Sequence, residues 1–152
     1  MGLNGHKAII LVADDDEDDC LLIRDALEEN GFRGRHEFVY DGKALMDALY
    51  DIINGAGDFG VPDLILLDLN MPKKDGREAL NEIKSQPKLK DIPVVILTTS
   101  SDSRDIELCN RLGASSYITK PMIFSEWVSA LGSLHTYLTE PGQSSPKPDS
   151  KE

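Results

Sequence analysis

The chain has 152 residues, with 16 basic and 27 acidic side chains and a formal net charge of −11. This length suits one domain with its own core, and so acidic a surface repels phosphodiester backbones, so we expect no nucleic-acid partner. No apolar run reaches the roughly 18 residues of a membrane span and the N-terminus lacks a signal-peptide pattern, which predicts a cytoplasmic protein with no membrane partner.

Five segments of the sequence predict β-strands, and a helical pattern follows each of them. Three strands are continuous apolar runs, typical of strands buried on both faces of a parallel sheet, and two are shorter and more polar. The helical segments carry apolar residues at three- and four-residue spacing. In chain order, the predicted strands are residues 7–13, 35–40, 63–67, 92–97 and 116–119, and the predicted helices are 16–30, 45–53, 78–85, 102–112 and 124–138.

Turn signals separate these elements. Asp75-Gly76 predicts a turn into a helix, and Gly113 suits a helix C-terminal cap. Residues 54–60 (NGAGDFG) are rich in Gly and predict a flexible loop. They lack the lysine and the spacing of a phosphate-binding loop, so we expect a plain connection. From residue 139 the sequence is rich in Pro, Ser and Lys. We therefore expect one domain over residues 1–138, followed by a disordered polar tail over residues 139–152.

The repeated alternation of strand and helix predicts an α/β fold, doubly wound, with a parallel sheet between helices on both faces. Polar residues stand at the carboxyl ends of four of these strands: Asp14, Asp15, Asp68, Thr98 and Lys120. The carboxyl ends of parallel strands share one edge, where open α/β sheets bind their ligands. Five polar residues at that edge indicate a functional site.

Three carboxylates at one edge predict a cluster that either holds a proton or binds a cation. At about 4 Å and an effective dielectric of 20, each pair of like charges costs about 4 kcal/mol, which a bound cation relieves. Oxygen ligands without His or Cys favour Mg²⁺ or Mn²⁺. Beside such an ion one carboxylate can attack a phosphoryl group, while Lys120 pairs with the phosphoryl oxygens and the Thr98 hydroxyl donates to them. A metal-assisted aspartyl phosphate is therefore the chemistry that uses all five residues.

Each of these residues also has a purely structural interpretation. Asp14 and Asp15 can cap the helix that follows them, as Asp16 to Asp19 can. Asp68 can be a helix-capping or solvated acid. Thr98 can be an ordinary strand-end hydroxyl, and Lys120 a surface lysine.

At these residues the sequence resembles the response-regulator receiver family. The matching features are the strand that ends in Asp14-Asp15, LLDLNMPKKDG with Asp68, PVVILTT with Thr98, and YITKP with Lys120. The resemblance covers about residues 7–138. It implies a flavodoxin-like (βα)5 three-layer sandwich with a parallel sheet of strand order 2-1-3-4-5.

The resemblance also implies a function and a metal site. It implies a single-domain response regulator of a two-component phosphorelay, in which Asp68 accepts a phosphoryl group from a histidine kinase or a phosphotransfer protein. Asp15, Asp68 and the backbone carbonyl of Asn70 would bind Mg²⁺ or Mn²⁺ directly, and Asp14 through water. Such a chain is no enzyme beyond its own phosphorylation and dephosphorylation. The Gly-rich insert and the LNMPKKDGREAL run are most similar to the receivers of phytochrome-type kinases.

The resemblance further implies a conformational switch. Lys120 would contact the phosphoryl group, and the peptide bond from Lys120 to Pro121 would be cis. Thr98 would move toward the phosphoryl group, and Tyr117 would swing inward. The sequence departs from the commonest family pattern at Thr99, where Ala is frequent. A larger residue there predicts slower access of water and hence slower dephosphorylation.

The last helical segment predicts an interaction surface. Apolar residues cover about half of its circumference, more than one sheet face needs. We expect Trp127, Leu134 and Leu138 to form part of a homodimer or partner surface. The alternative is a long helix that folds back over its own core.

Three other functions fit parts of the sequence. A Mg²⁺-dependent phosphatase with an aspartyl nucleophile, similar to haloacid dehalogenases, would have a second Asp where Asn70 stands. A degenerate receiver would act as an interaction module without phosphorylation, although all five site residues are present. A flavin-binding protein would need a phosphate-cradling loop after the first strand, where the acids stand.

Overall fold

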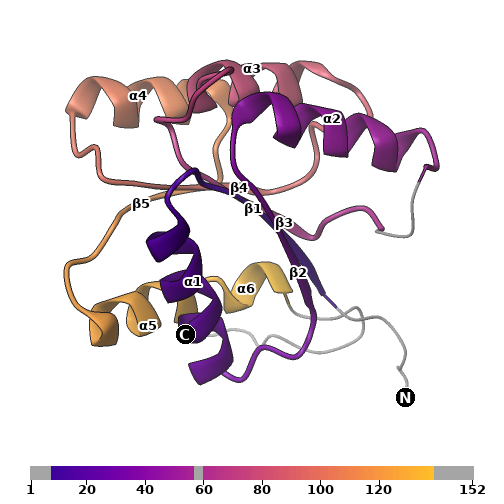
Figure 1. The fold of residues 1–152 in the computed structure, drawn as a ribbon. Coiled ribbons are helices and arrows are strands. Elements are labelled where there is room, and N and C mark those ends of the chain that lie inside the picture. The colour runs from indigo at the N-terminus through magenta and orange to yellow at the C-terminus, as the bar shows by residue number, and fades with distance from the viewer. Residues whose placement is uncertain (1–7, 57–59, 139–152) are drawn as a thin grey trace, which may run out of the picture.

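The computed structural model describes residues 8–56 and 60–138 and shows five parallel strands in the order β2-β1-β3-β4-β5 (Figure 1). This confirms the predicted fold class and strand order. The strands are β1 (Ile9–Ala13), β2 (Arg35–Val39), β3 (Leu64–Leu67), β4 (Val94–Thr98) and β5 (Ser116–Thr119). The helices are α1 (Glu17–Glu29), α2 (Gly42–Ile53), α3 (Gly76–Ser85), α4 (Ser103–Leu112), α5 (Phe124–Gly132) and α6 (His135–Leu138).

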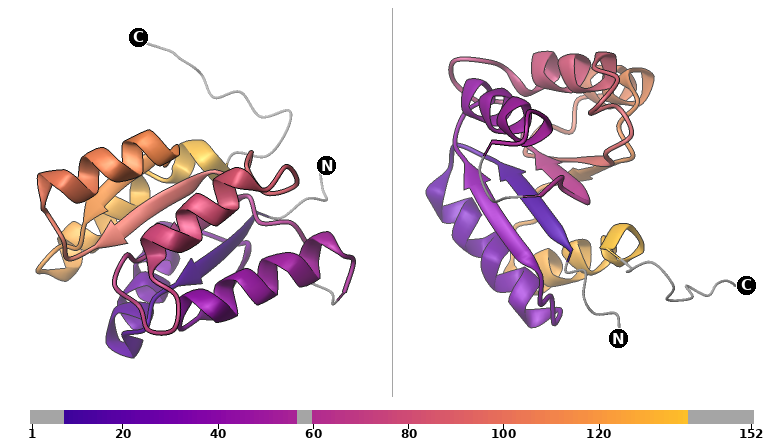
Figure 2. Two further views of the ribbon diagram at one scale, coloured as in Figure 1. Left: turned by 90° about the horizontal axis from the view of Figure 1, so that it is seen from above. Right: turned by 90° about the vertical axis from the view of Figure 1, so that its right-hand side faces the viewer.

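The three central strands form the middle layer because their apolar side chains are covered on both faces. Every residue of β1, β3 and β4 is buried, whereas β2 and β5, at the sheet edges, are partly exposed. Successive side chains point to opposite faces. Leu11 and Ala13 accordingly join the core under α2, α3 and α4, while Ile10 and Val12 join the core under α1 and α5. Figures 1 and 2 show these two helical layers on either side of the sheet.

Aspartate caps begin four of the helices. Asp16 accepts hydrogen bonds from the backbone N–H groups of Asp18 and Asp19, as predicted. Asp75 caps α3 in a capping box with Glu78, so α3 begins two residues before the predicted start. Asp41 and Asp102 cap α2 and α4. Gly113 ends α4 in the left-handed conformation, φ 101°, which confirms its predicted role.

The predicted helix over residues 124–138 is divided in two. After α5 ends, the N–H groups of Ser133 and Leu134 donate to the carbonyls three residues earlier, Ala130 and Leu131. These bonds form a tighter turn than an α-helix, and Gly132 is a poor helix former at this point. The chain resumes helical geometry only at α6.

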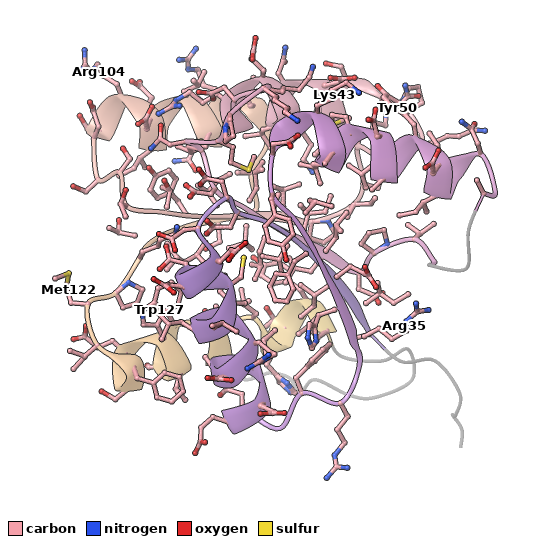
Figure 3. All side chains as sticks on the ribbon, in the orientation of Figure 1. Arg35, Lys43, Tyr50, Arg104, Met122 and Trp127 are labelled. Carbon is pink, nitrogen blue, oxygen red and sulfur yellow. The ribbon has the colours of Figure 1, made fainter. Side chains whose placement is uncertain are left out.

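The prediction that Trp127 and Leu134 form an interaction surface is wrong. Trp127 and Leu134 are 2% and 1% exposed within the protein's own core, and Leu138 is half-buried against the same core. The apolar face of α5 is broad because α5 packs against both the sheet and α1. The side chain of Asn30, the C-terminal cap of α1, donates to the Val128 carbonyl at 2.9 Å. Figure 3 shows Trp127 on the inner side of α5, whereas Met122, in the loop before it, extends outward.

Two predicted segments lie partly or wholly outside the described residues. These are the Gly-rich connection, of which residues 57–59 are not described, and the polar tail over residues 139–152. In the part of the chain that the structure covers, no helix has the length and apolar character that crossing a bilayer would require.

Candidate functional site

The strand register brings Asp14 and Asp68 together at the carboxyl edge of the sheet. Ala13 of β1 pairs with Leu67 of β3, and the Asp68 N–H donates to the Ala13 carbonyl at 3.0 Å. The next residue on β1, Asp14, is held to β2 through the Val39 carbonyl, also at 3.0 Å. Both carboxylates therefore emerge from adjacent, rigid strand ends, as the sequence predicted.

Asp15 joins these two residues in a compact acidic cluster. One carboxylate oxygen from each of Asp14, Asp15 and Asp68 lies within 4.8 Å of the others. Asp14 and Asp68 are buried at 2% and 6% exposure, while Asp15 is exposed, so the cluster is open to solvent on one side. Three oxygen ligands without a nitrogen or sulfur ligand fit a hard divalent cation such as Mg²⁺ or Mn²⁺.

Lys120 provides the positive charge at this cluster. Its Nζ atom lies 2.8 Å from Asp14 Oδ2 and 3.0 Å from Asp68 Oδ2, and its side chain is 6% exposed. The Lys120 N–H donates to the Thr98 carbonyl at 2.7 Å, which fixes the residue beyond the end of β5. Lys120 is thus a buried part of the site, not a surface lysine.

Asp19 is a residue of this site that the sequence analysis missed. Its Oδ2 atom lies 2.6 Å from Lys120 Nζ, closer than either cluster carboxylate. The sequence analysis assigns Asp19 only to the helix cap. No local pattern distinguishes it, because Asp19 is one of six consecutive acids at residues 14–19.

The charges of the cluster are not balanced. Burial raises the pKa of Asp14 to about 6, although hydrogen bonds from Lys120 and from the Asp16 N–H oppose this shift. Burial acts to lower the pKa of Lys120, but its hydrogen bonds to Asp14 and Asp19 outweigh burial and raise that pKa above its usual value. Four carboxylates, those of Asp14, Asp15, Asp19 and Asp68, lie around the single ammonium of Lys120, and this excess of negative charge favours a cation.

Thr98 places an unused hydroxyl at the end of β4, the strand beside β3. The residue is fully buried, and its Oγ1 has no hydrogen-bond partner in the structure as described. A buried unpaired hydroxyl is unfavourable, so it needs a partner such as a water molecule or a ligand. A phosphoryl oxygen is a partner of suitable chemistry.

Tyr117 connects β5 to the loop after β4. Its hydroxyl donates to the Ser100 carbonyl at 2.8 Å, and burial raises the pKa of this phenol. Ser100 in turn donates through Oγ to Asp105 Oδ2 at 2.6 Å. Thr99, between Thr98 and Ser100, is exposed. No pattern in the sequence predicts the contact of Ser100 with Asp105, which joins this loop to α4.

The loop after β3 passes close to the cluster. Asn70 is exposed, and its N–H lies 3.4 Å from Asp68 Oδ1. The Gly76 N–H donates to the Leu69 carbonyl, and a Cβ atom at Gly76 would lie 2.1 Å from the Asp68 carbonyl oxygen. Only glycine therefore allows α3 to begin this close to Asp68.

The predicted cis peptide between Lys120 and Pro121 is wrong for this structure. No peptide bond among the described residues is cis, so this one is trans. A trans bond is the usual state before proline, favoured by about 0.5–1 kcal/mol.

Comparisons with known proteins agree with this geometry. The family model described as "Response regulator receiver domain" matches residues 10–132. The chain is 41% identical over 118 residues to the probable methanogenesis regulatory protein FilR2 of Methanothrix harundinacea, covering 78% of this chain and 75% of FilR2. It is also 41% identical over 115 residues to the response regulator Rcp1 of Synechocystis, covering 74% of this chain and 76% of Rcp1.

Two solved structures have the same fold. The phosphorylated cyanobacterial phytochrome response regulator RcpA aligns with a TM-score of 0.78 at 38% identity, over 88% of this chain and 94% of RcpA. The Mn²⁺-bound form of Rcp1 aligns with a TM-score of 0.74 at 33% identity, over 92% of this chain and 99% of Rcp1.

Proposed function

Because the chain belongs to the response regulator receiver domain family, a family of signalling proteins, we propose that it accepts a phosphoryl group on Asp68 from a histidine kinase or a phosphotransfer protein. The observation that carries this proposal is the contact of Lys120 with Asp68 inside the acidic cluster. Asp68 is the cluster acid at the end of the central strand β3. The similarity to RcpA, whose solved structure is phosphorylated, supports the proposal.

Asp15, Asp68 and the backbone carbonyl of Asn70 would hold Mg²⁺ or Mn²⁺ directly, and Asp14 through water. The oxygen ligands of the cluster and the Mn²⁺-bound form of the similar Rcp1 support this assignment. When bound, the ion neutralises charge on the incoming phosphoryl group.

The protein's own residues do the rest of the chemistry. A carboxylate oxygen of Asp68 forms a bond to phosphorus as the bond from phosphorus to the donor breaks and the leaving group departs with the electron pair. Lys120 balances the negative charge of the phosphoryl oxygens, and the Thr98 hydroxyl donates to one of them. The unpartnered Thr98 Oγ1 supports the latter role.

The phosphoryl group would be read through a change in protein–protein contacts. Thr98 would move toward it, and Tyr117 would respond, because Tyr117 is hydrogen-bonded to the loop that follows Thr98.

Thr99 would slow the entry of the attacking water, so Thr99→Ala should shorten the half-life of the aspartyl phosphate. An equal half-life in both proteins would refute this role of Thr99.

A phytochrome-type histidine kinase in the cytoplasm is the partner we propose, because RcpA is a phytochrome response regulator.

The homodimer predicted from the sequence would need a surface other than Trp127 and Leu134, which are buried. Sedimentation with and without phosphorylation tests the dimer, and a strict monomer in both states would exclude it.

Acetyl phosphate and Mg²⁺ test the phosphorylation itself. Intact-mass measurement should show that the protein gains one phosphoryl group, and that Asp68→Asn or removal of Mg²⁺ with EDTA prevents the gain. Asp63→Asn is a matched control, because Asp63 lies at the opposite end of the same strand, where it accepts from the Ile9 N–H at 2.8 Å. This control should still be phosphorylated, whereas a phosphorylated Asp68→Asn variant would contradict the proposal.

A further inference from the structure

The three carboxylates around Lys120 are of two kinds. Asp14 and Asp68 belong to the acidic cluster that suits a divalent cation. Asp19 bonds to Lys120 at 2.6 Å, but its oxygens are not part of that cluster. Among the described residues, Asp19 is the one ion-pair partner of Lys120 that a bound cation leaves free.

Asp19 is also held independently of the cluster. It stands in the first turn of α1, and its backbone N–H donates to the capping carboxylate of Asp16 at 3.2 Å. Its side chain is 19% exposed. The helix therefore holds the backbone of Asp19 in place, whatever occupies the cluster.

A divalent cation and Lys120 compete for the same groups. Lys120 Nζ contacts the Oδ2 atoms of Asp14 and Asp68, which would engage the ion through water and directly, respectively. Both of these contacts of Lys120 would weaken on metal binding, because a dication attracts carboxylates more strongly than an ammonium does. The contact with Asp19 remains.

We propose that Asp19 is a positioning residue that keeps the Lys120 ammonium at the site when a metal ion and a phosphoryl group engage Asp14 and Asp68. This inference rests on the proposed function and assigns a role within it to one further residue. Without Asp19, Lys120 has only the cluster carboxylates as partners, and the ion must displace it from both. Removal of Asp19 should thus weaken metal binding beyond the effect of one lost negative charge.

The matched control is Asp18, the exposed neighbour of Asp19 in the same helical turn. Asp18→Asn and Asp19→Asn remove the same charge, but only the second releases Lys120. Titration calorimetry of the full chain with Mg²⁺ should show binding about three- to tenfold weaker for Asp19→Asn than for Asp18→Asn, a coupling in the range seen for contacting residues. Equal affinities of the two variants would overturn the proposal.

Two more variants separate positioning from a general structural effect. Asp19→Glu keeps the charge and should restore at least part of the affinity and of the phosphorylation rate with acetyl phosphate, which Asp19→Asn lowers. In a Lys120→Met background, the difference between Asp18→Asn and Asp19→Asn should vanish, and a persistent difference would contradict the role of Lys120. Thermal unfolding shows which variants are folded. If Lys120→Met does not fold, the comparison of Asp18→Asn, Asp19→Asn and Asp19→Glu decides whether Asp19 positions Lys120.

Failure of this inference is distinct from failure of the proposed function. If the unmodified protein binds no Mg²⁺, or is not phosphorylated on Asp68, the proposed function is refuted. If it does both and Asp19→Asn behaves as Asp18→Asn does, only the role of Asp19 is refuted.

Discussion

Lys120 and Arg77 each bind more than one carboxylate, but in opposite electrostatic settings. Arg77 forms two 2.8 Å hydrogen bonds to Asp105 and two more, of 2.9 and 3.1 Å, to Asp75. Lys120 faces Asp14, Asp19 and Asp68 with a single ammonium group. Arg77 and its two carboxylates, the Arg77 group, join α3 to α4. Lys120 and its three carboxylates, the Lys120 group, lie at the open edge of the sheet.

The pKa values show what this difference means. Hydrogen bonds from Arg77 and Ser100 lower the pKa of Asp105 to about 2, so its charge is stabilised by the fold. Burial raises the pKa of Asp14 to about 6, so its charge is disfavoured by the fold. Arg77 holds each of its two carboxylates with two hydrogen bonds and so stabilises the protein. The Lys120 group retains unsatisfied negative charge that a metal ion can neutralise.

The largest effect on stability is expected at the Arg77 group. Arg77→Ala leaves Asp105 and Asp75 without their cation and should lower the free energy of unfolding by about 1–3 kcal/mol, as for charged hydrogen bonds elsewhere. Urea unfolding measures this loss. The control is Lys43→Ala, which removes an exposed ion pair with Asp47 on α2 (Figure 3) and should have no measurable effect. Equal losses for the two variants would mean that Arg77 does not join the helices.

The opposite sign is expected at the Lys120 group. Asp14→Asn removes one of several crowded charges and should raise the free energy of unfolding by about 1–2 kcal/mol without divalent metal, because like charges a few ångströms apart repel. Urea unfolding in EDTA measures this gain, and Mg²⁺ should diminish it by stabilising the unmodified protein. A destabilised Asp14→Asn variant in EDTA would show that the cluster is balanced by Lys120 alone.

The smallest effect is a pH dependence of the Arg77 group. Because the pKa of Asp105 is lowered on folding, its carboxylate adds stability that is complete above the unfolded value of 3.8 and is lost as the pH falls toward about 2. The difference in unfolding free energy between the unmodified protein and Asp105→Asn should therefore be constant above pH 5 and shrink below pH 4. A difference that does not change with pH would exclude an ionised Asp105 as its source.

Much of the fold and of the site could be predicted, because local sequence patterns mark the buried strands and the site residues stand at their carboxyl ends. Continuous apolar runs identified the buried strands, although their ends differ from the prediction by one or two residues. The register of β1 with β3 then necessarily brings Asp14 and Asp68 to one edge. Local patterns alone sufficed for this part.

The features that could not be predicted depend on contacts between distant elements. The width of the apolar face of α5 depends on how α1 packs against it, so Trp127 was assigned to a surface although it is buried. The Arg77–Asp105 ion pair joins residues 28 positions apart, and no local pattern signals it. Asp19 looked equivalent to its acidic neighbours until the cap at Asp16 fixed which of them faces Lys120.

The most direct test of the central claim identifies the residue that becomes phosphorylated. After treatment with acetyl phosphate and Mg²⁺, borohydride reduces an aspartyl phosphate to homoserine, which peptide mass spectrometry can locate in the chain. The account predicts a homoserine in place of Asp68, dependent on Mg²⁺, with Asp14 and Asp15 unchanged. Homoserine at either of these other acids, or at none of the three, would contradict it.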